Sequence, residues 1–268
     1  MHISKINPNR FIGRSVLITG SGSKAGIGFA TAELMLRSGA RVAITSTTKR
    51  ILERKAELNA LGEVAAFVAD LTDLRQVETL ANQAIAAFGK IDILVNNAGM
   101  SKVGDAENFT PLTEMPHTEW HKTIERNLTT CFNITRALLP GMVKDGYGRV
   151  VNVSSVTGPL VSNPGESAYS AAKAAMVGLS RGVAIEVGKS GVTINNVAPG
   201  WIGTESILEE ERVAAENTPL GRAGTPGEVA QLIAFLASDE ATYITGQCFV
   251  IDGGNALQEY KGPSELYY

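Results

Sequence analysis

The stretch "TGSGSKAGIG", residues 19–28, follows the short apolar run "SVLI" and leads into the helical pattern "FATAELMLRSG". Glycine lets a backbone turn tightly and approach a ligand closely. The helix that follows offers unpaired N–H groups and the positive end of its dipole, which suits a phosphate. A strand, a glycine-rich turn and a helix in this order are typical of a dinucleotide site. The four glycines are Gly20, Gly22, Gly26 and Gly28.

Short apolar runs recur along the chain, and helical patterns separate them. Continuous hydrophobicity is typical of strands that are covered on both faces, and alternation with helices predicts parallel βαβ units. We therefore expect one α/β domain over residues 1–268, with a Rossmann-type, doubly wound parallel sheet of about seven strands and helices on both faces. The expected strands are 15–20, 40–45, 64–69, 91–96, 149–155, 192–200 and 248–252, and the expected helices are 27–38, 49–60, 73–88, 118–143, 167–188 and 226–238.

Three segments fit this alternation poorly: 100–116, 201–218 and the tail 255–268. The first two follow strand ends. Loops beyond the carboxyl ends of parallel strands form the binding crevice of an open sheet. We expect both loops to surround the substrate.

Composition excludes several classes of protein. The net charge of −3 and pI near 5.7 argue against a nucleic-acid surface, which needs a basic stripe. No apolar run reaches the roughly 20 residues that span a bilayer, and residues 1–18 do not read as a signal peptide. The two cysteines, Cys131 and Cys248, are expected to be buried thiols in a reducing cytoplasm and not a disulfide.

The second expected strand ends "ITSTTKR", residues 44–50, and no Asp or Glu occurs between Glu33 and Glu53. An NAD site usually places a carboxylate near this point to bind the ribose 2′-hydroxyl. Hydroxyls and cations in its place favour a 2′-phosphate, so NADP(H) is favoured and NAD(H) stays possible. The alternative is that the basic residues only begin a solvated helix. The candidate donors are Ser46, Thr47 and Thr48, and the candidate cations are Lys24, Lys49 and Arg50.

The segment "ESAYSAAKAAM", residues 166–176, places Tyr169 and Lys173 four residues apart, on one face of an expected helix. A nearby ammonium lowers the pKa of a phenol, which suits proton exchange with an alcohol or carbonyl oxygen. "NVSS", residues 152–155, ends a strand at the same sheet edge. Ser155 is therefore positioned to bind the reacting oxygen.

Taken together, the motifs resemble those of the short-chain dehydrogenase/reductase family over almost the whole chain, nearest in pattern to members that reduce 3-oxoacyl thioesters. Their order and spacing make this resemblance specific. The motifs are "TG…GIG" (19–28), "NNAG" (96–99), "RN" (126–127), "NVSS" (152–155), "YSAAK" (169–173), "NNVAPG" (195–200) with Thr204, and "ITGQCFVIDGG" (244–254).

The resemblance implies a role for each matching position. Tyr169 is expected to be the general acid, Lys173 to bind the nicotinamide ribose and activate Tyr169, and Ser155 to orient the carbonyl. Asn127 is expected to hold a water that links Lys173 to solvent. The expected cofactor contacts are Gly20, Ser21, Ser23, Lys24, Gly26, Ile27, Gly28, Ser46, Thr47, Thr48, Asp70, Leu71, Asn97, Ala98, Gly99, Tyr169, Lys173, Pro199, Gly200, Ile202 and Thr204.

The chain departs from the family pattern in four places. The glycine loop has five residues, "SGSKA", where the family has three. The segment between Gly99 and Asn127 is longer, the segment after Thr204 is shorter, and the tail is longer. The last three changes fall where substrate recognition is expected, so the family's substrates do not carry over.

We therefore expect an NADP(H)-dependent oxidoreductase that interconverts a small or cyclic ketone and a secondary alcohol. The first alternative is a 3-oxoacyl-[acyl-carrier-protein] or CoA reductase, which the acidic segment after Thr204 disfavours because such a partner is itself acidic. The second alternative, from another class, is a non-catalytic NADP(H)-binding regulatory protein. The acidic residues are Glu205, Glu209, Glu210 and Glu211.

Two further features are open to interpretation. His117 and His121 lie four residues apart, but no third ligand is nearby, so a solvated helix start is expected and no metal site. Helices 118–143 and 167–188 are apolar on several faces, which predicts a homotetramer built as a dimer of dimers. The aromatic tail is expected to pack on a neighbouring subunit through Tyr260, Leu266, Tyr267 and Tyr268.

Overall fold

Seven strands form one parallel sheet in the computed structural model, which describes residues 7–99, 109–259 and 262. The strand order is β3-β2-β1-β4-β5-β6-β7, and every neighbouring pair is parallel. This order confirms the predicted doubly wound sheet. The strands are β1 (Ser15–Ile18), β2 (Arg41–Ser46), β3 (Val64–Val68), β4 (Ile93–Asn96), β5 (Gly148–Val153), β6 (Val192–Pro199) and β7 (Cys248–Ile251).

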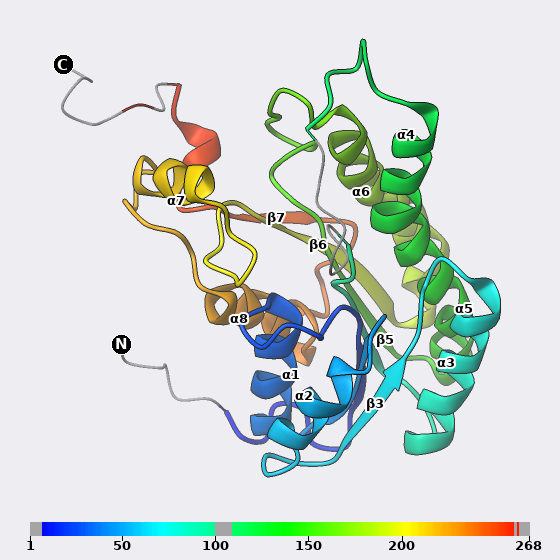
Figure 1. Cartoon of the computed structure of the whole chain (residues 1–268). Coiled ribbons are helices and arrows are strands. Elements are labelled where there is room, and N and C mark those ends of the chain that lie inside the picture. Colours follow the sequence, from blue (N-terminus) through cyan, green and yellow to red (C-terminus); the bar gives the residue numbers. More distant parts are fainter. Residues whose placement is uncertain (1–6, 100–108, 260–261, 263–268) are drawn as a thin grey trace.

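Alternate residues of each strand face opposite layers of helices. In β1, Val16 and Ile18 belong to one apolar cluster and Leu17 belongs to the other. This period of two is the geometry of a strand covered on both sides. Figure 1 shows the two helical layers on either side of the sheet. One layer is α1 (Ile27–Arg37), α2 (Arg50–Leu58) and α8 (Pro226–Leu236); the other is α3 (Leu74–Phe88), α5 (Thr130–Asp145) and α6 (Ser167–Val187).

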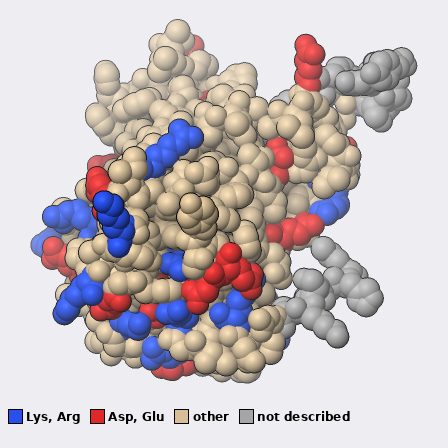
Figure 2. All heavy atoms as spheres, turned by 180° about the vertical axis from the view of Figure 1, so that it is seen from behind, with Lys and Arg blue, Asp and Glu red and all other residues tan. Residues whose placement is uncertain are grey.

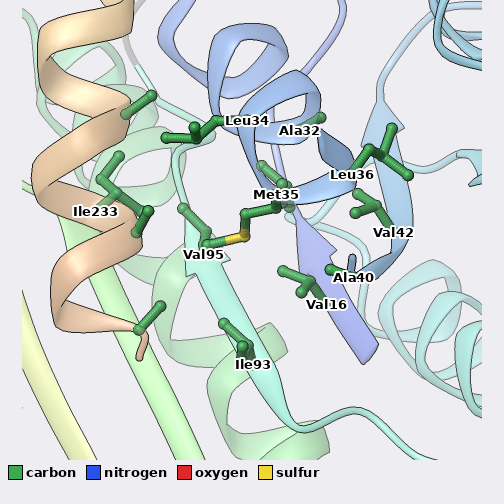
Figure 3. Close-up of a cluster of buried hydrophobic side chains, with 14 of the residues drawn as sticks. Val16, Ala32, Leu34, Met35, Leu36, Ala40, Val42, Ile93, Val95 and Ile233 are labelled. Atoms are coloured by element: carbon green, nitrogen blue, oxygen red, sulfur yellow. The ribbon is translucent and has the colours of Figure 1, made fainter. Parts of the chain in front are cut away.

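Met35 lies at the centre of the first layer. Figure 3 shows its side chain reaching from α1 toward Val95 of β4, with Val16 beside it and Ile233 of α8 opposite. Met35, Val16, Val95 and Ile233 are all fully buried. The packing of α1 on α8 and on the sheet therefore fixes the direction in which the glycine loop leaves β1.

Two expectations about helices need correction. The expected helix 118–143 is α4 (His117–Ile124) followed by α5, and a π-helical turn, η1 (Glu125–Thr129), joins them. The expected loop 201–218 contains the short helix α7 (Glu209–Glu216). Its acidic first turn complements the helix dipole, and Glu211 accepts the backbone N–H of Leu208 at 2.8 Å. The short 3₁₀ turns are η2 (Gly188–Ser190), η3 (Asp239–Ala241) and η4 (Asn255–Leu257).

The strand order reverses at β1, which lies between β2 and β4. Consecutive crossovers therefore run in opposite directions from this point, and a crevice opens beyond the carboxyl ends of the strands. The glycine loop after β1 and the "NAG" turn after β4 stand on its two sides. The fold thus brings the main motifs to one edge of the sheet.

The surface charges, the two cysteines and the helix lengths bear on the expectations drawn from composition. Figure 2 shows Lys/Arg and Asp/Glu intermingled over the face seen from behind, so no basic stripe gathers on this face. Cys131 is buried and Cys248 is half-buried, and both are free thiols. The expected disulfide-free state is confirmed, although Cys248 is less buried than we expected. Among the described helices, none has the length and apolar character needed to cross a membrane.

Candidate active site

A cavity of about 940 Å³ opens at the carboxyl edge of the sheet. The ends of β4, β5 and β6, the start of α6 and the segment from Pro199 to Ala214 surround it. This volume is in the range of small-molecule and cofactor sites. Of the expected site residues, the cavity is lined by Ser23, Ile27, Asn97, Gly99, Ser155, Tyr169, Lys173, Pro199, Gly200, Ile202 and Thr204.

Tyr169 and Lys173 lie one turn apart on α6, as the sequence predicts. Lys173 is buried, its Nζ donates to the carbonyl oxygen of Val153 at 3.0 Å, and that Nζ lies 5.5 Å from the centre of the Tyr169 ring. The bond to β5 holds the ammonium in place beneath the phenol. A fixed positive charge there favours negative charge on the Tyr169 oxygen.

Ser155 follows β5 and faces the same cavity. Its Oγ accepts a hydrogen bond from the backbone N–H of Thr157 at 3.1 Å. A hydroxyl has one hydrogen to donate, and within the described residues that of Ser155 has no acceptor, so it can serve a ligand. The site therefore presents two hydroxyl groups, on Ser155 and Tyr169, that can bind one oxygen atom.

Asn127 lies in the π turn between α4 and α5 and is buried. Its Nδ2 donates to the carbonyl oxygen of Thr123 at 3.1 Å. A Cβ on Gly99 would stand 2.9 Å from Asn127 Oδ1 and 3.4 Å from Lys173 Nζ, so both groups flank this glycine. The extra residue of a π turn often occurs at functional sites. Here the π turn places Asn127 close to both Gly99 and Lys173.

A buried polar network joins the two strands and the helix that carry the candidate site residues. Asn96 donates to Asn152 Oδ1 at 2.7 Å, and Asn152 donates to Ser180 Oγ at 2.9 Å. These groups tie β4, β5 and α6 together in the interior. Cys131 also contacts Asn152, and burial raises the pKa of its thiol to about 12, so Cys131 is not a nucleophile at neutral pH.

The glycine loop packs closely against the "NAG" turn. Gly20 has a φ of +70°, and a Cβ there would lie 2.8 Å from Ala98 Cα. A Cβ on Gly28 would lie 2.6 Å from Asn97 Nδ2. These two glycines are therefore required by the contact between two loops. Gly26 caps α1 without any side-chain hydrogen bond, so the N–H groups of the first turn stay open beside the cavity.

The three polar side chains of this loop have different surroundings. Ser21 is fully buried, and its hydroxyl donates to the carbonyl oxygen of Ile18 at 3.3 Å, away from the cavity. Ser23 lines the cavity and donates to Glu205 Oε2 at 2.7 Å. Lys24 is exposed and pairs with Glu57 of α2 at 3.3 Å. Of these three side chains, only that of Ser23 faces the cavity.

Arg50, at the start of α2, is the candidate cation for a 2′-phosphate that lines the cavity. Its Nε is buried and has no hydrogen-bond partner in the described structure, and the side chain lines the cavity. Its Nη2 lies 3.7 Å from the point where a Cβ on Gly22 would stand, and Ser46 Oγ, which donates to the carbonyl oxygen of Thr48 at 3.0 Å, lies 3.1 Å from that point. A guanidinium beside a bare glycine fits an anionic group such as a 2′-phosphate. Thr47 and Thr48 are exposed and do not line the cavity.

Asp70 and Leu71 lie after β3, outside the cavity lining. The Asp70 carboxylate accepts from Thr72 Oγ1 at 2.7 Å, and Leu71 is buried. Their expected contact with the adenine stays a prediction.

Sequence reasoning missed part of the cavity wall. Glu166, one turn before Tyr169, lines the cavity together with Glu211 of α7 and Asn255 of η4. The period of α6 gave a signal for Glu166, because residues three apart share a helix face. Glu211 belongs to the acidic segment after Thr204 that the sequence placed near the substrate, whereas no local signal marked Asn255, which reaches the cavity only through tertiary packing. The missed apolar lining comprises Phe109, Val156, Val161, Trp201, Ile207, Leu208 and Ala214.

The Glu166 carboxyl is half-buried, and burial is the main cause that raises its pKa above the usual value. The hydrogen bond from Asn163 Nδ2, at 2.8 Å, lowers this pKa, and the charge of Glu211 raises it further. The substrate side of the cavity is therefore acidic.

His117 and His121 are exposed on α4. Within residues 7–99, 109–259 and 262, no group of three His, Cys, Asp or Glu side chains is placed to hold a metal ion. The part of the loop at 100–108 and the tail residues Tyr260, Leu266, Tyr267 and Tyr268 lie outside the described residues.

Comparisons with known proteins agree over almost the whole chain. A family model described as enoyl-(acyl carrier protein) reductase matches residues 20–256. The oxidoreductase UcpA of Salmonella typhimurium is 39% identical and covers 93% of this chain and 97% of its own. The 3-oxoacyl-[acyl-carrier-protein] reductase FabG of Thermotoga maritima is 41% identical, with 91% and 98% covered. The crystal structure of levodione reductase has a TM-score of 0.86 at 34% identity and covers 94% of this chain and 100% of its own.

Proposed function

The chain belongs to the short-chain dehydrogenase/reductase family of enzymes that act on CH–OH groups with NAD(P)(H), and on that premise we propose that it is an NADP(H)-dependent ketone reductase. Its substrate is a small or cyclic carbonyl compound or the matching secondary alcohol. The observation that carries this proposal is that Ser155, Tyr169 and Lys173 line one cavity of about 940 Å³.

The roles of the catalytic residues follow from their positions. A bound nicotinamide supplies the hydride in reduction and accepts it in oxidation. Tyr169 gives its phenolic proton to the carbonyl oxygen during reduction and takes it back from the alcohol during oxidation. Ser155 donates its free hydrogen to the same oxygen. Lys173 stabilises the negative charge that remains on Tyr169, because Val153 holds its ammonium beneath the ring.

Asn127 is proposed to hold a water that passes protons between Lys173 and solvent. Its position in the π turn, facing Gly99 on the same side as Lys173, supports this role. A proton must return to Tyr169 after each reduction, so the buried ammonium needs such an outlet.

The preference for NADP(H) rests on Arg50. Its buried Nε, which has no hydrogen-bond partner in the described structure, and the bare backbone of Gly22 fit a 2′-phosphate, and no carboxylate lies at the end of β2. The open first turn of α1, with Ile27 and Ser23 facing the cavity, fits the pyrophosphate. Lys24 is a weaker candidate than Arg50, because it already pairs with Glu57.

A 3-oxoacyl thioester is the second candidate substrate, and the FabG relatives support it by name. An acyl carrier protein or CoA brings negative charge to the mouth of the site. Glu205, Glu209 and Glu210 are exposed there and would repel that charge. A non-catalytic role is disfavoured because every expected catalytic side chain is present.

Assembly as a dimer of dimers remains part of the proposal. Phe132 and Val143 of α5 and Ile185 of α6 are exposed, which supports contacts between subunits on these helices. The free thiols of Cys131 and Cys248 support a cytoplasmic location.

The test is to follow NADPH oxidation with levodione, a simple cyclic ketone and an acetoacetyl thioester, with Tyr169→Phe as the control variant. Turnover of a cyclic ketone that disappears in the variant supports the proposal. Fast turnover of the thioester alone would make the second candidate correct. Absence of turnover with every ketone, despite NADPH binding, would favour a non-catalytic role.

A further inference from the structure

The substrate end of the cavity has three polar side chains without a full set of partners. Glu166 and Glu211 each use Oε2, the first to accept from Asn163 and the second to accept from the backbone of Leu208. No hydrogen bond or ion pair reaches the Oε1 atom of either carboxylate within the described residues. Both side chains line the cavity, and their charges are close enough to oppose each other.

Asn255 is the independent observation that points to a ligand. It is 5% exposed and lines the same cavity, yet its side-chain amide makes no hydrogen bond in the described part of the chain. Because this side chain lines the cavity and makes no hydrogen bond within the described residues, its amide is available to a polar ligand. Its Oδ1 is a third acceptor on the wall of the same cavity.

Apolar side chains also line the cavity, among them Phe109, Trp201 and Leu208. Lys173 is bound to the carbonyl oxygen of Val153 beneath Tyr169, at the reacting end. Within the described residues, no cation pairs with Glu166 or Glu211. A ligand that fits must combine an apolar body with a positively charged hydrogen-bond donor.

We propose that the enzyme acts on ketones or secondary alcohols that carry a protonated amine, which Glu166, Glu211 and Asn255 bind while Tyr169 and Ser155 hold the reacting oxygen. An ammonium offers three donors and a positive charge, which match three acceptors of which two are carboxylates. This inference rests on the proposed function and names its substrate class.

Three isosteric alcohols test the inference: 3-amino-1-phenylpropan-1-ol, 1-phenylpropane-1,3-diol and 1-phenylbutan-1-ol. They differ only in an ammonium, a hydroxyl or a methyl group at one end. With NADP⁺ as oxidant at pH 8, kcat/KM for the amino alcohol is expected to exceed that for the methyl compound by at least about tenfold, since hydrogen bonds to charged groups are the strong ones. The diol is expected to fall between them.

Glu166→Gln is expected to remove most of this preference by raising KM for the amino alcohol more than KM for the methyl compound. Asn255→Ala is expected to have a smaller effect in the same direction. Glu209→Gln, which removes an exposed carboxylate outside the cavity lining, is the matched control and should keep the preference. Thermal unfolding of each variant shows that the fold is kept.

Equal or better use of the methyl compound or the diol would overturn the inference. The same holds if the enzyme reduces levodione or an acetoacetyl thioester but does not oxidise the amino alcohol; the proposed function would then survive without this substrate class. If Tyr169→Phe changes none of these rates, the proposed function itself fails.

Discussion

The two edges of the sheet handle polar groups differently. At the amino edge, Asp92 pairs with Lys90 at 2.7 Å and with Arg14 at 3.9 Å, and it accepts the backbone N–H of Ser15 at 2.9 Å. At the carboxyl edge, Arg50 and Asn255 have no side-chain partner in the described structure. Polar groups that serve only the fold find partners within the chain. Those left without partners at the carboxyl edge mark where a ligand belongs.

The amino edge is not perfectly paired, which sharpens the contrast. Arg149 Nε lacks a partner there, but its Nη1 donates to the carbonyl oxygens of Gly148 and Gly191, and its Nη2 lies 3.5 Å from Asp239. Tyr147 stacks against the guanidinium groups of Arg14 and Arg149 and donates to Asp239 at 2.8 Å. Each side chain at this edge is held by several neighbours.

The largest expected difference between the edges concerns their tyrosines. Tyr169→Phe removes the proton donor and should lower kcat by about 10³-fold, within the usual range for general acid catalysis. Tyr147→Phe removes a hydroxyl from the paired edge and should leave kcat unchanged. Steady-state rates with any accepted ketone measure both variants. Similar losses in the two variants would mean that the tyrosines matter only for folding.

The next difference concerns the basic residues near the cofactor end. Arg50→Gln should raise KM for NADPH by about 10–100-fold and leave KM for NADH within about threefold, because the lost interaction is a charge-assisted bond to the 2′-phosphate. Lys24→Gln is the matched control and should have little effect, since Lys24 pairs with Glu57. A larger effect of Lys24→Gln than of Arg50→Gln would reverse this assignment.

These two predictions mark the limit of what the sequence could reveal. Apolar runs located the strands, and parallel topology then brought Ser155, Tyr169 and Lys173 to one edge. The sequence also offered three candidate cations, Lys24 in the glycine loop and Lys49 and Arg50 after β2, but which one faces the cavity depends in part on Glu57 of α2, which pairs with Lys24. Such a choice is made by tertiary contacts and leaves no local pattern.

The π turn and α7 were unpredictable for related reasons. The turn at Glu125–Thr129 adds no breaker residue to a continuous helical pattern, and it depends on the packing of Asn127 against Gly99. Helix α7 is acidic and has only one buried residue, Ala215, so it lacks the apolar period that identifies an amphipathic helix. Its N-terminal charges and cap stabilise it instead.

A substitution at the amino edge of the sheet is expected to change stability without changing the kinetic constants. Asp92→Asn keeps the shape of a side chain that is 1% exposed but removes its charge, which should lower the free energy of unfolding by about 2 kcal/mol. Values of KM for cofactor and substrate should not change. Asp145→Asn, at an exposed position, should change stability by less than about 0.5 kcal/mol. Urea unfolding measures both variants, and equal stability of the two would show that the ion pairs of Asp92 contribute nothing.

A smaller, pH-dependent effect is expected at Glu228, which caps α8 outside the cavity lining. Hydrogen bonds from Arg222 and Thr225 lower its pKa from 4.5 to about 2. Its stabilising contribution is therefore present above pH 4.5 and is lost as the pH falls toward 2. Glu228→Gln should cost about 1 kcal/mol at pH 7, since the pair is partly screened by water, and less at pH 3. A cost that does not change with pH would mean that its charge is not involved.

The smallest effect has the opposite sign and occurs at Glu166, where α6 begins beside the cavity. Burial raises the pKa of this carboxyl above 4.5, so the folded chain holds its proton more tightly than the unfolded chain. Its contribution to stability is fully present below pH 4.5 and is lost as the pH rises through the folded value. Glu166→Gln should therefore raise Tm at pH 8 by about 1–2 °C and leave Tm unchanged at pH 4. A fall in Tm at pH 8 would show that Glu166 stabilises the fold, and the reason to expect a ligand at this carboxylate would be lost.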